Sequence, residues 1–134
     1  MIDVHDGSII IPGGENIAPG ASESQFLSTQ TGRSAALVID NGDYRTYRVE
    51  TRDLAALAYF HKGRLSSVDL VVTMPGDEAG WDGVSEVGEK KRKAKHDEVL
   101  RKFLGDPPYV YPWGKVESTY DARDVTSSVV VTYV

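Results

Sequence analysis

Short runs of alternating apolar and polar residues recur along this 134-residue chain and predict antiparallel strands. Residues 35–39 and 44–50 form the clearest pair, because they flank Asn41-Gly42, two residues that tolerate the positive φ angles of a type I′ hairpin turn. The same reasoning predicts two further hairpins: residues 54–60 with 64–74 around His61-Lys62-Gly63, and residues 115–120 with 127–134 through residues 121–124.

The alternation in residues 64–74 predicts which side chains share a face. One side carries Val68, Leu70 and Val72, and the other carries Ser67, Asp69, Val71 and Thr73. Residues 129–134 are apolar at almost every position, which is typical of a strand covered on both faces and predicts a central place in the sheet. The Pro-rich segment that follows Gly105 and precedes Trp113-Gly114 is interpreted as a turn.

A short helix is predicted at residues 21–32. Ser22 or Ser24 can cap its first turn, and Gly32 can end it. A helix of about two turns fits between these signals and is among the shortest that proteins form.

A long helix is predicted at residues 84–104, capped by Asp82 or Ser85 and ended by Gly105. On a helical projection one face carries His96, Leu100, Phe103 and Leu104. We therefore expect the second half of this helix to pack on the sheet and the first half to be mostly solvated.

Together these elements predict a single α+β domain over residues 1–134, in which residues 1–20 form an extended N-terminal segment with one strand candidate, Ser8–Ile11. We expect a single antiparallel sheet of five to seven strands, with one short and one long helix packed on one face. The chain has no cysteine, which excludes a disulfide framework, and no apolar run near the roughly 18 residues of a membrane span. Residues 1–6 lack the cationic and apolar regions of a signal peptide, so a cytoplasmic location is expected for the chain as given, or a periplasmic or envelope location if a signal sequence has been removed.

Charge is distributed unevenly along the chain, whose net charge is −5. Residues 89–102 hold seven Lys and Arg against three acidic residues, whereas the other 120 residues hold 8 basic and 17 acidic residues. A mostly acidic body argues against nucleic acid as a partner, because nucleic-acid phosphates require a broad basic footprint. The basic run is typical of the solvated face of a helix.

Candidate catalytic groups do not assemble into a known pattern. Gly20-Ala21-Ser22-Glu23-Ser24 departs from a nucleophile elbow at its fifth position, so Ser22 is interpreted as a helix cap. The three histidines, His5, His61 and His96, lack the spacing of a metal site. The acidic residues that begin at Asp77 fail the EF-hand pattern at its third and fifth positions. The sequence therefore predicts no enzyme, no metal and no cofactor.

His96 is the one histidine on the packed face of the long helix. We expect it to be partly buried, hydrogen-bonded to the carboxylate of Glu89 or Asp97, and structural. The alternative is an acid–base role for His96 with one of these two carboxylates.

The loop before the long helix is acidic and contains a tryptophan, a combination suited to a protein interface. Its candidate partner-binding residues are Asp77, Glu78, Trp81, Asp82 and Glu86. Trp81 also has a structural interpretation, in which it and Trp113 clamp the two ends of the long helix onto the sheet.

The chain from Trp81 onward carries a set of motifs: Trp81, Ser85-Glu86, Glu89, His96-Asp97, Leu100, Gly105, Trp113-Gly114, Ser118 and Tyr120-Asp121-Ala122-Arg123. This set resembles a group of small, uncharacterised bacterial proteins in which a tryptophan precedes a charged helix with an HD-like pair, followed by WG and YD-x-R. The resemblance implies no activity. It implies polar contacts along one helix edge from Glu89 to His96, and a final turn ordered by Asp121 and Arg123, with Asp121 accepting backbone N–H groups. The residues to which it assigns structural roles are Glu89, His96, Asp97, Trp113, Tyr120, Asp121 and Arg123.

A second similarity lies upstream. Ile17-Ala18-Pro19-Gly20, leading into a short helix that ends at Gly32, is similar to the opening of β-lactamase-inhibitor-protein-like and outer-membrane assembly lipoprotein domains. The cysteine that the lipoprotein family carries is absent from this sequence.

We expect a non-enzymatic protein-binding domain, such as an immunity or inhibitor protein that neutralises a basic partner such as a toxin. Small size, an acidic body and a sheet able to present an open face favour this hypothesis, because an acidic surface speeds the capture of a basic protein. The similarity to lipoprotein domains suggests an alternative, an envelope structural or assembly module, and a domain without a partner is the other alternative. The sequence makes no prediction about the oligomeric state.

Overall fold

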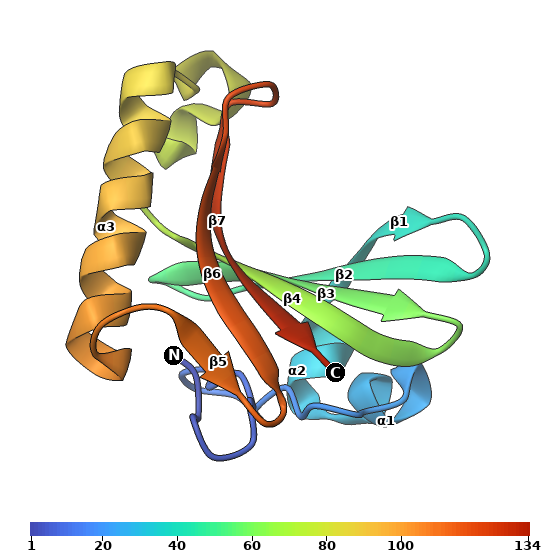
Figure 1. Cartoon of the computed structure of the whole chain (residues 1–134). Helices are drawn as coiled ribbons and strands as arrows, with labels where there is room; N and C mark the ends of the chain where they lie inside the picture. The colour runs from blue at the N-terminus through green and yellow to red at the C-terminus, as the bar shows by residue number, and fades with distance from the viewer.

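The computed structural model describes the backbone of residues 1–134 and the side chains of all of them except Trp81 and Asp82. One seven-stranded antiparallel sheet has the order β1-β2-β3-β4-β7-β6-β5 (Figure 1). Its strands are β1 (Ala36–Asp40), β2 (Tyr44–Glu50), β3 (Leu54–His61), β4 (Arg64–Val72), β5 (Tyr109–Tyr111), β6 (Gly114–Asp121) and β7 (Thr126–Tyr133). The helices are α1 (Glu23–Ser28), α2 (Gln30–Ser34), the 3₁₀ helix η1 (Asp77–Gly83) and α3 (Glu86–Leu104). The predicted α+β fold is confirmed.

The three predicted hairpins are present, but the first turn has a different geometry from the expected one. Of its two central residues, Gly42 alone has a positive φ, 86°. The side chain of Asn41 instead accepts the N–H of Tyr44 at 3.1 Å, a local bond that asparagine offers in many turns. Two successive positive φ angles occur between β3 and β4, at Lys62 (50°) and Gly63 (79°).

The last strand has the predicted central place, because β7 lies between β4 and β6. The edge strand β5 is not predicted by the sequence. It is only three residues long and lies between Pro108 and Pro112, and a sheet tolerates proline at such an edge.

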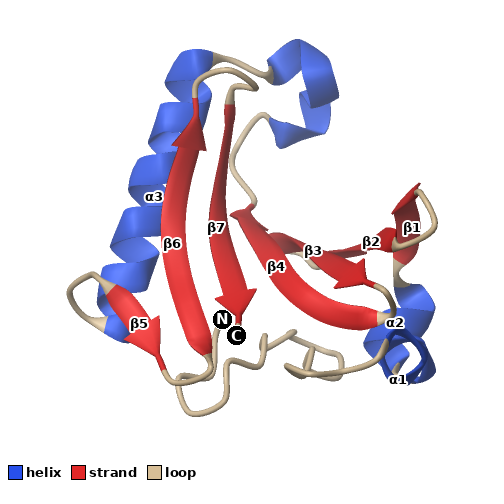
Figure 2. Ribbon diagram, turned by 45° about the vertical axis from the view of Figure 1, so that its right-hand side comes forward, coloured by secondary structure: helices blue, strands red, loops and turns tan.

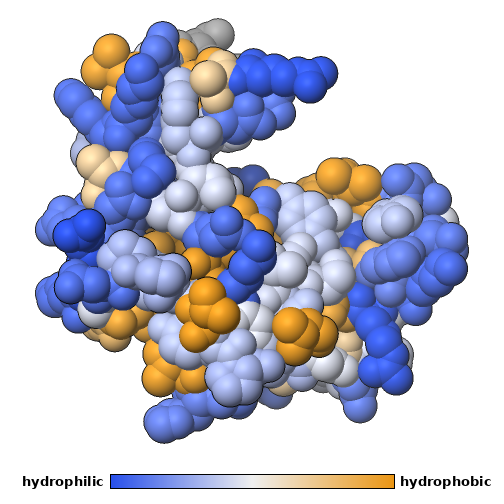
Figure 3. All heavy atoms as spheres, in the orientation of Figure 1, coloured by the Kyte–Doolittle hydropathy of each residue, from blue (hydrophilic) through white to orange (hydrophobic). Residues whose placement is uncertain are grey.

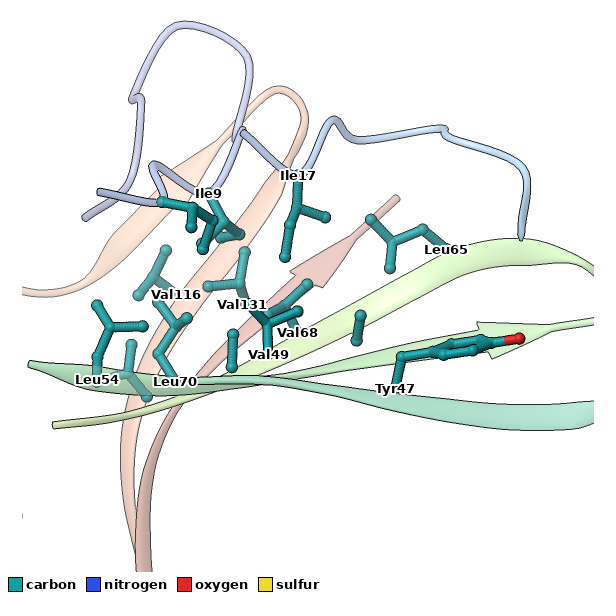
Figure 4. Packing of buried hydrophobic residues seen from close by; sticks show 14 of the residues in the cluster. Ile9, Ile17, Tyr47, Val49, Leu54, Leu65, Val68, Leu70, Val116 and Val131 are labelled. Carbon is teal, nitrogen blue, oxygen red and sulfur yellow. The ribbon is translucent and has the colours of Figure 1, made fainter. Parts of the chain in front are cut away.

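Residues 8–11 do not form the predicted strand. Ile9 makes single antiparallel bridges to Ile2 and Ile17, so the segment folds back on itself. Ile9 and Ile17 are buried and lie close to Val116 and Val131 of the central strands (Figure 4). The apolar run therefore covers the core instead of extending the sheet.

The predicted helix at residues 21–32 is divided in two at Thr29. The backbone of Thr29 is extended (φ −76°, ψ 159°), and its side chain caps α2 by accepting the N–H of Gly32 at 3.0 Å. Ser22 caps α1, as predicted. Gly32 lies inside α2, so it does not end the helix as predicted. A Cβ at this position would lie 1.8 Å from the carbonyl oxygen of Phe26, so only glycine allows this close approach.

The long helix α3 is capped by Ser85 and ended by Gly105. Its contact with the sheet follows an i, i+4 ridge: Arg92, His96, Leu100 and Leu104. Such a ridge drifts by about 40° around the helix for every four residues. Phe103 therefore lies away from the contact line and is 65% exposed, which corrects its predicted place on the packed face. The expected solvation of the first half is also wrong at Arg92, which is buried.

One face of the sheet is covered by α1, α2, α3 and the N-terminal segment (Figures 1 and 2). The hydrophobic strand residues buried in the core on this side are Tyr47, Val49, Leu54, Ala56, Ala58, Phe60, Leu65, Val68, Leu70, Tyr109, Val116, Val129 and Val131. The opposite side of β2, β3, β4, β7 and β6 faces solvent, and we call it the open face.

Candidate functional site

The open face consists of cross-strand rows of side chains, because paired residues of an antiparallel sheet point to the same side. Its first row is Thr46, Tyr59, Ser67, Thr132 and Lys115, and its second row is Arg48, Leu57, Asp69, Val130 and Glu117. Beyond these rows β4 and β7 no longer pair, so Glu50, Ala55 and Val71 form one short row and Ser128 and Thr119 form another. The predicted alternation in β4 is confirmed. Val68 and Leu70 are buried on the helix side at 0% and 1% exposure, and Asp69 lies on the open face.

The open face is hollow. β6 and β7 run steeply across the direction of β2, β3 and β4 (Figure 1), and the molecular surface is recessed between the turns at the far ends of these two groups of strands (Figure 3). Leu57, Val71 and Val130 are only partly buried in this hollow. A concave, partly apolar surface that faces solvent is typical of sites that bind another molecule.

Two ion pairs flank the hollow. Arg48 Nε lies 2.6 Å from Glu50 Oε1 on β2, and Lys115 Nζ lies 3.1 Å from Glu117 Oε1 on β6. Each pair compensates its own charges. Asp69 lies between the two pairs, on β4 in the middle of the sheet.

Asp69 is hydrogen-bonded to Tyr59 in the middle of the open face. The Tyr59 hydroxyl donates to Asp69 Oδ2 at 3.1 Å. Burial raises the pKa of Asp69, and burial together with the Asp69 charge raises the pKa of Tyr59 to about 12. The phenol of Tyr59 therefore stays neutral and remains a hydrogen-bond donor at physiological pH.

A groove of about 790 Å³ adjoins the open face where β4 ends. One wall is formed by open-face residues at the end of the sheet, including Arg48 and Val71, and the other by η1 and the start of α3. Of the predicted partner-binding residues, Asp77 and Glu78 line this groove. Glu86 pairs with Lys90 on α3 at 2.7 Å. The other two, Trp81 and Asp82, lie outside the described side chains.

The carboxylate of Asp77 is used inside the fold. Arg92 holds it in a two-pronged contact, with Nη2 2.5 Å from Oδ1 and Nη1 3.0 Å from Oδ2. The hydrogen bonds from Arg92 hold the pKa of Asp77 below its usual range. Asp77 therefore ties the loop before α3 to the helix. Its role in partner binding stays a prediction.

Arg92 and His96 are the polar residues of the α3 ridge, and we call them the polar ridge. The polar ridge lies where β4 and β7 separate. These strands pair only from Ser67 to Leu70 on β4, so the next residues lack a partner strand on this side. The Val72 N–H donates to His96 Nε2 at 3.1 Å, and the Val72 carbonyl accepts from Arg92 Nη1. Helix side chains thus satisfy backbone groups that would otherwise be unpaired.

The β7 side of this separation is held in the same way. Glu89 Oε1 accepts the Ser127 N–H at 3.0 Å, and the Ser127 hydroxyl donates to the Glu89 carbonyl at 2.5 Å. Glu89 Oε2 also accepts from Arg92 Nε at 3.1 Å. The polar contacts expected along the edge from Glu89 to His96 are therefore present.

His96 is fully buried, at 0% exposure, and its partner is a backbone N–H instead of the expected carboxylate. Burial, followed by the charge of Arg92, lowers the pKa of His96 to about 4. The imidazole is therefore neutral at physiological pH, and acceptance of a hydrogen bond at Nε2 assigns its proton to Nδ1. The neighbouring Asp97 pairs with Lys93 at 2.8 Å.

Trp113 packs against the N-terminal segment. Its indole N–H donates to the Val4 carbonyl at 2.8 Å, its ring stacks on Tyr111 with a centroid distance of 4.9 Å, and a Cβ at Gly7 would lie 2.5 Å from its ring. The predicted clamp on the end of the long helix is corrected accordingly. Trp113 fastens residues 1–8 to the sheet.

The remaining motif residues lie at the turn between β6 and β7. Asp121 Oδ1 accepts the backbone N–H groups of Arg123 at 2.9 Å and Asp124 at 3.3 Å, which confirms that Asp121 orders this turn. Arg123 is exposed there. Lys90 Nζ lies 5.7 Å from the centre of the Tyr120 ring, a cation–π contact that joins α3 to β6.

Within the described residues, no group of three or more His, Cys, Asp or Glu is arranged to hold a metal ion. None of the helices in the described part of the chain combines the length and apolarity needed to cross a membrane. Comparison with family models, curated proteins and solved structures gives no match to this chain.

Sequence reasoning does not single out Asp69 or Tyr59 as site residues. The available signal is the alternation in β4, which places a carboxylate opposite the buried side chains of Val68 and Leu70. The hollow around Asp69 depends on the curvature of the whole sheet, and no local pattern encodes that curvature.

Proposed function

We propose that this chain is a non-enzymatic protein-binding domain that holds a basic partner on its open face, in the manner of an immunity or inhibitor protein. The observation that carries this proposal is the hollow open face, where Leu57, Val71 and Val130 remain partly exposed while helices cover the other side of the sheet (Figure 2). An apolar, solvent-facing hollow on a folded domain is typical of an interface.

Charge favours a basic partner. The chain carries a net charge of −5, and the open face has the carboxylate of Asp69 at its centre. The adjoining groove is lined by four acidic and four basic residues, so it leaves this charge unchanged. Opposite charge speeds the encounter of two proteins and disfavours competitors of the same sign.

The contacts of the candidate catalytic residues support binding over catalysis. His96 is buried and neutral, with Val72 as its partner. Asp97 is paired with Lys93, and Ser22 caps α1. Each of these groups helps to build the fold, and none is presented to a substrate on the open face.

Site-specific photo-cross-linking in the cell that produces the protein tests this proposal. A photoreactive phenylalanine derivative replaces Leu57 on the open face, and the matched control carries it at Phe103, an exposed apolar residue of α3. We expect the Leu57 variant alone to cross-link one basic protein, and the two purified proteins to form a stoichiometric complex that weakens with salt. Cross-links to that protein from Phe103 but not from Leu57, or no complex between the purified proteins, would contradict the proposal.

A further inference from the structure

Asp69 has mainly apolar neighbours on the open face. Leu57 of β3 and Val130 of β7 lie directly opposite it on the two adjacent strands, and Val71 follows it on the same side of β4. These side chains reduce the hydration of the carboxylate, and burial raises the pKa of Asp69. The ionised form of Asp69 is therefore less well solvated here than in water.

The open face does not supply a cation to this carboxylate. Its basic residues Arg48 and Lys115 are engaged by Glu50 and Glu117, at 2.6 Å and 3.1 Å. Among the described side chains, Asp69 has no ion-pair partner, and its one hydrogen bond comes from Tyr59 to Oδ2 at 3.1 Å. Oδ1 accepts no hydrogen bond from the described residues and is left as an acceptor.

We propose that Asp69 and Tyr59 form a receptor for one guanidinium group, the side chain of an arginine on the basic partner. This assignment rests on the proposed function. A guanidinium would compensate the charge of Asp69, and its planar fork can donate to both carboxylate oxygens. The aliphatic part of an arginine side chain can lie along Leu57, Val71 and Val130.

The surroundings of Asp69 favour arginine over lysine. A guanidinium is more weakly hydrated than an ammonium group, so it enters a partly apolar hollow at lower cost. The free chain keeps a poorly solvated carboxylate without a cation, which lowers its own stability. Loss of stability at a binding site is a common consequence of function.

An NMR titration of the ¹⁵N-labelled chain at low ionic strength tests the receptor. The probe is an acetylated and amidated Gly-Arg-Gly peptide, and its control contains citrulline, which keeps the shape of arginine but has no charge. We expect saturable shifts at the amides of Leu57, Asp69 and Val130 with the arginine peptide only. Asp69→Asn should weaken binding by about tenfold or more, as expected for the loss of a charge-assisted hydrogen bond.

Glu117→Gln is the matched variant, because it removes the same charge from the same row of the open face. It should leave the affinity of the arginine peptide within about twofold, since Glu117 is already paired with Lys115. Equal weakening by the two variants would show that only net charge is recognised. Shifts confined to η1 would place the site elsewhere. Either result overturns the receptor.

Two further measurements keep the outcomes distinct. Thermal unfolding of Asp69→Asn should show a folded protein, and an unfolded variant would contradict the poor solvation on which the receptor rests. Tyr59→Phe keeps the aromatic ring but removes the hydroxyl donor. This variant should lower the affinity for the arginine peptide less than Asp69→Asn does. If the peptide does not bind while cross-links from Leu57 persist, the receptor is wrong and the proposed function stands; loss of both rejects both.

Discussion

His96 on α3 accepts the backbone N–H of Val72 on β4 through Nε2 at 3.1 Å. Val72 lies just beyond the point where β4 stops pairing with β7, so a helix side chain occupies the position that a neighbouring strand would otherwise fill. The groove that adjoins the open face lies at this point, where β4 ends. The buried polar ridge of α3 and the open face on the other side of the sheet therefore meet at this groove, which Arg92 and Val71 both line.

Replacing His96 by Leu keeps a buried side chain of similar size but leaves the Val72 N–H without a partner. We expect the free energy of unfolding to fall by about 1–3 kcal/mol, the cost of a buried unpaired donor. Urea unfolding measures it. His61→Leu is the control, because His61 is exposed, and it should change the value by less than about 0.5 kcal/mol. Equal losses in both variants would mean that the bond to Val72 contributes nothing.

The lowered pKa of His96 predicts a dependence of stability on pH. The unfolded chain binds a proton at the usual histidine pKa of 6.5, whereas the folded chain binds it only near pH 4, so stability is lost as the pH falls from 6.5 toward 4. The contribution of His96 over this window is at most about 3 kcal/mol. Urea midpoints should fall between about pH 7 and pH 5, and the slope should be smaller in His96→Leu. An unchanged slope in that variant would assign the pH dependence to other groups.

Arg92 connects Asp77, Glu89 and the Val72 carbonyl, so its removal leaves several acceptors without a donor. We expect Arg92→Met to lower the free energy of unfolding by about 3 kcal/mol. Arg92→Lys should recover little of the loss, because an ammonium group cannot reproduce the fork geometry. Lys91→Met, at the exposed neighbouring position, is the control. Full recovery by lysine would show that charge alone matters at this position.

Gly7 and Gly13 have similar positive φ angles, so comparing their alanine variants separates a steric effect from the conformational one. Gly7 (φ 82°) would place a Cβ 2.5 Å from the Trp113 ring, whereas a Cβ at Gly13 (φ 78°) would meet nothing within 4 Å. Both alanine variants should lose some stability because of the positive φ. Gly7→Ala should lose about 1–3 kcal/mol more, the usual cost of overpacking. Equal losses, measured by thermal unfolding, would contradict the close packing of Trp113 on the N-terminal segment.

Asp69→Asn should increase stability at neutral pH. Burial raises the pKa of Asp69 in the folded chain, so its ionised form opposes folding, and this penalty is present above the folded-state pKa and disappears in acid. The gain in unfolding temperature should therefore be larger at about pH 7 than at about pH 4. A destabilised variant at neutral pH would mean that the ionised carboxylate is well solvated in the free chain.

Much of the sheet is predictable because its signals are local. The three hairpins follow from alternating runs and turn residues, and the place of β7 between two other strands follows from its continuous apolar run. The cover that this run predicts on both faces of β7 is wrong, because Val130 and Thr132 lie on the open face. The predicted residues that fail depend on distant contacts. Phe103 is turned away by the drift of a helix ridge, and the place of Trp113 is set by Val4, 109 residues earlier in the chain. Gly32 resembles a helix end but serves the close approach of α2 to Phe26.

The candidate site, too, can be predicted from the sequence only where the signal is local. The face on which Asp69 lies can be predicted from the alternation in β4. The absence of an ion-pair partner for Asp69 among the described residues cannot be predicted in this way. It depends on Arg48 and Lys115 being paired with Glu50 and Glu117, two residues along their own strands. His96 could be placed on the packed face, but its backbone partner depends on the separation of β4 from β7.

The most direct test of the open face as a binding surface is methyl NMR of the chain mixed with the purified protein that cross-linking has identified as its partner. The methyl signals of Leu57, Val71 and Val130 should shift on complex formation. Those of Val87 on α3 and Val110 on β5, which are 65% and 72% exposed, should not. Shifts at Val87 and Val110 with unchanged signals from Leu57, Val71 and Val130 would show that the partner binds elsewhere than on the open face.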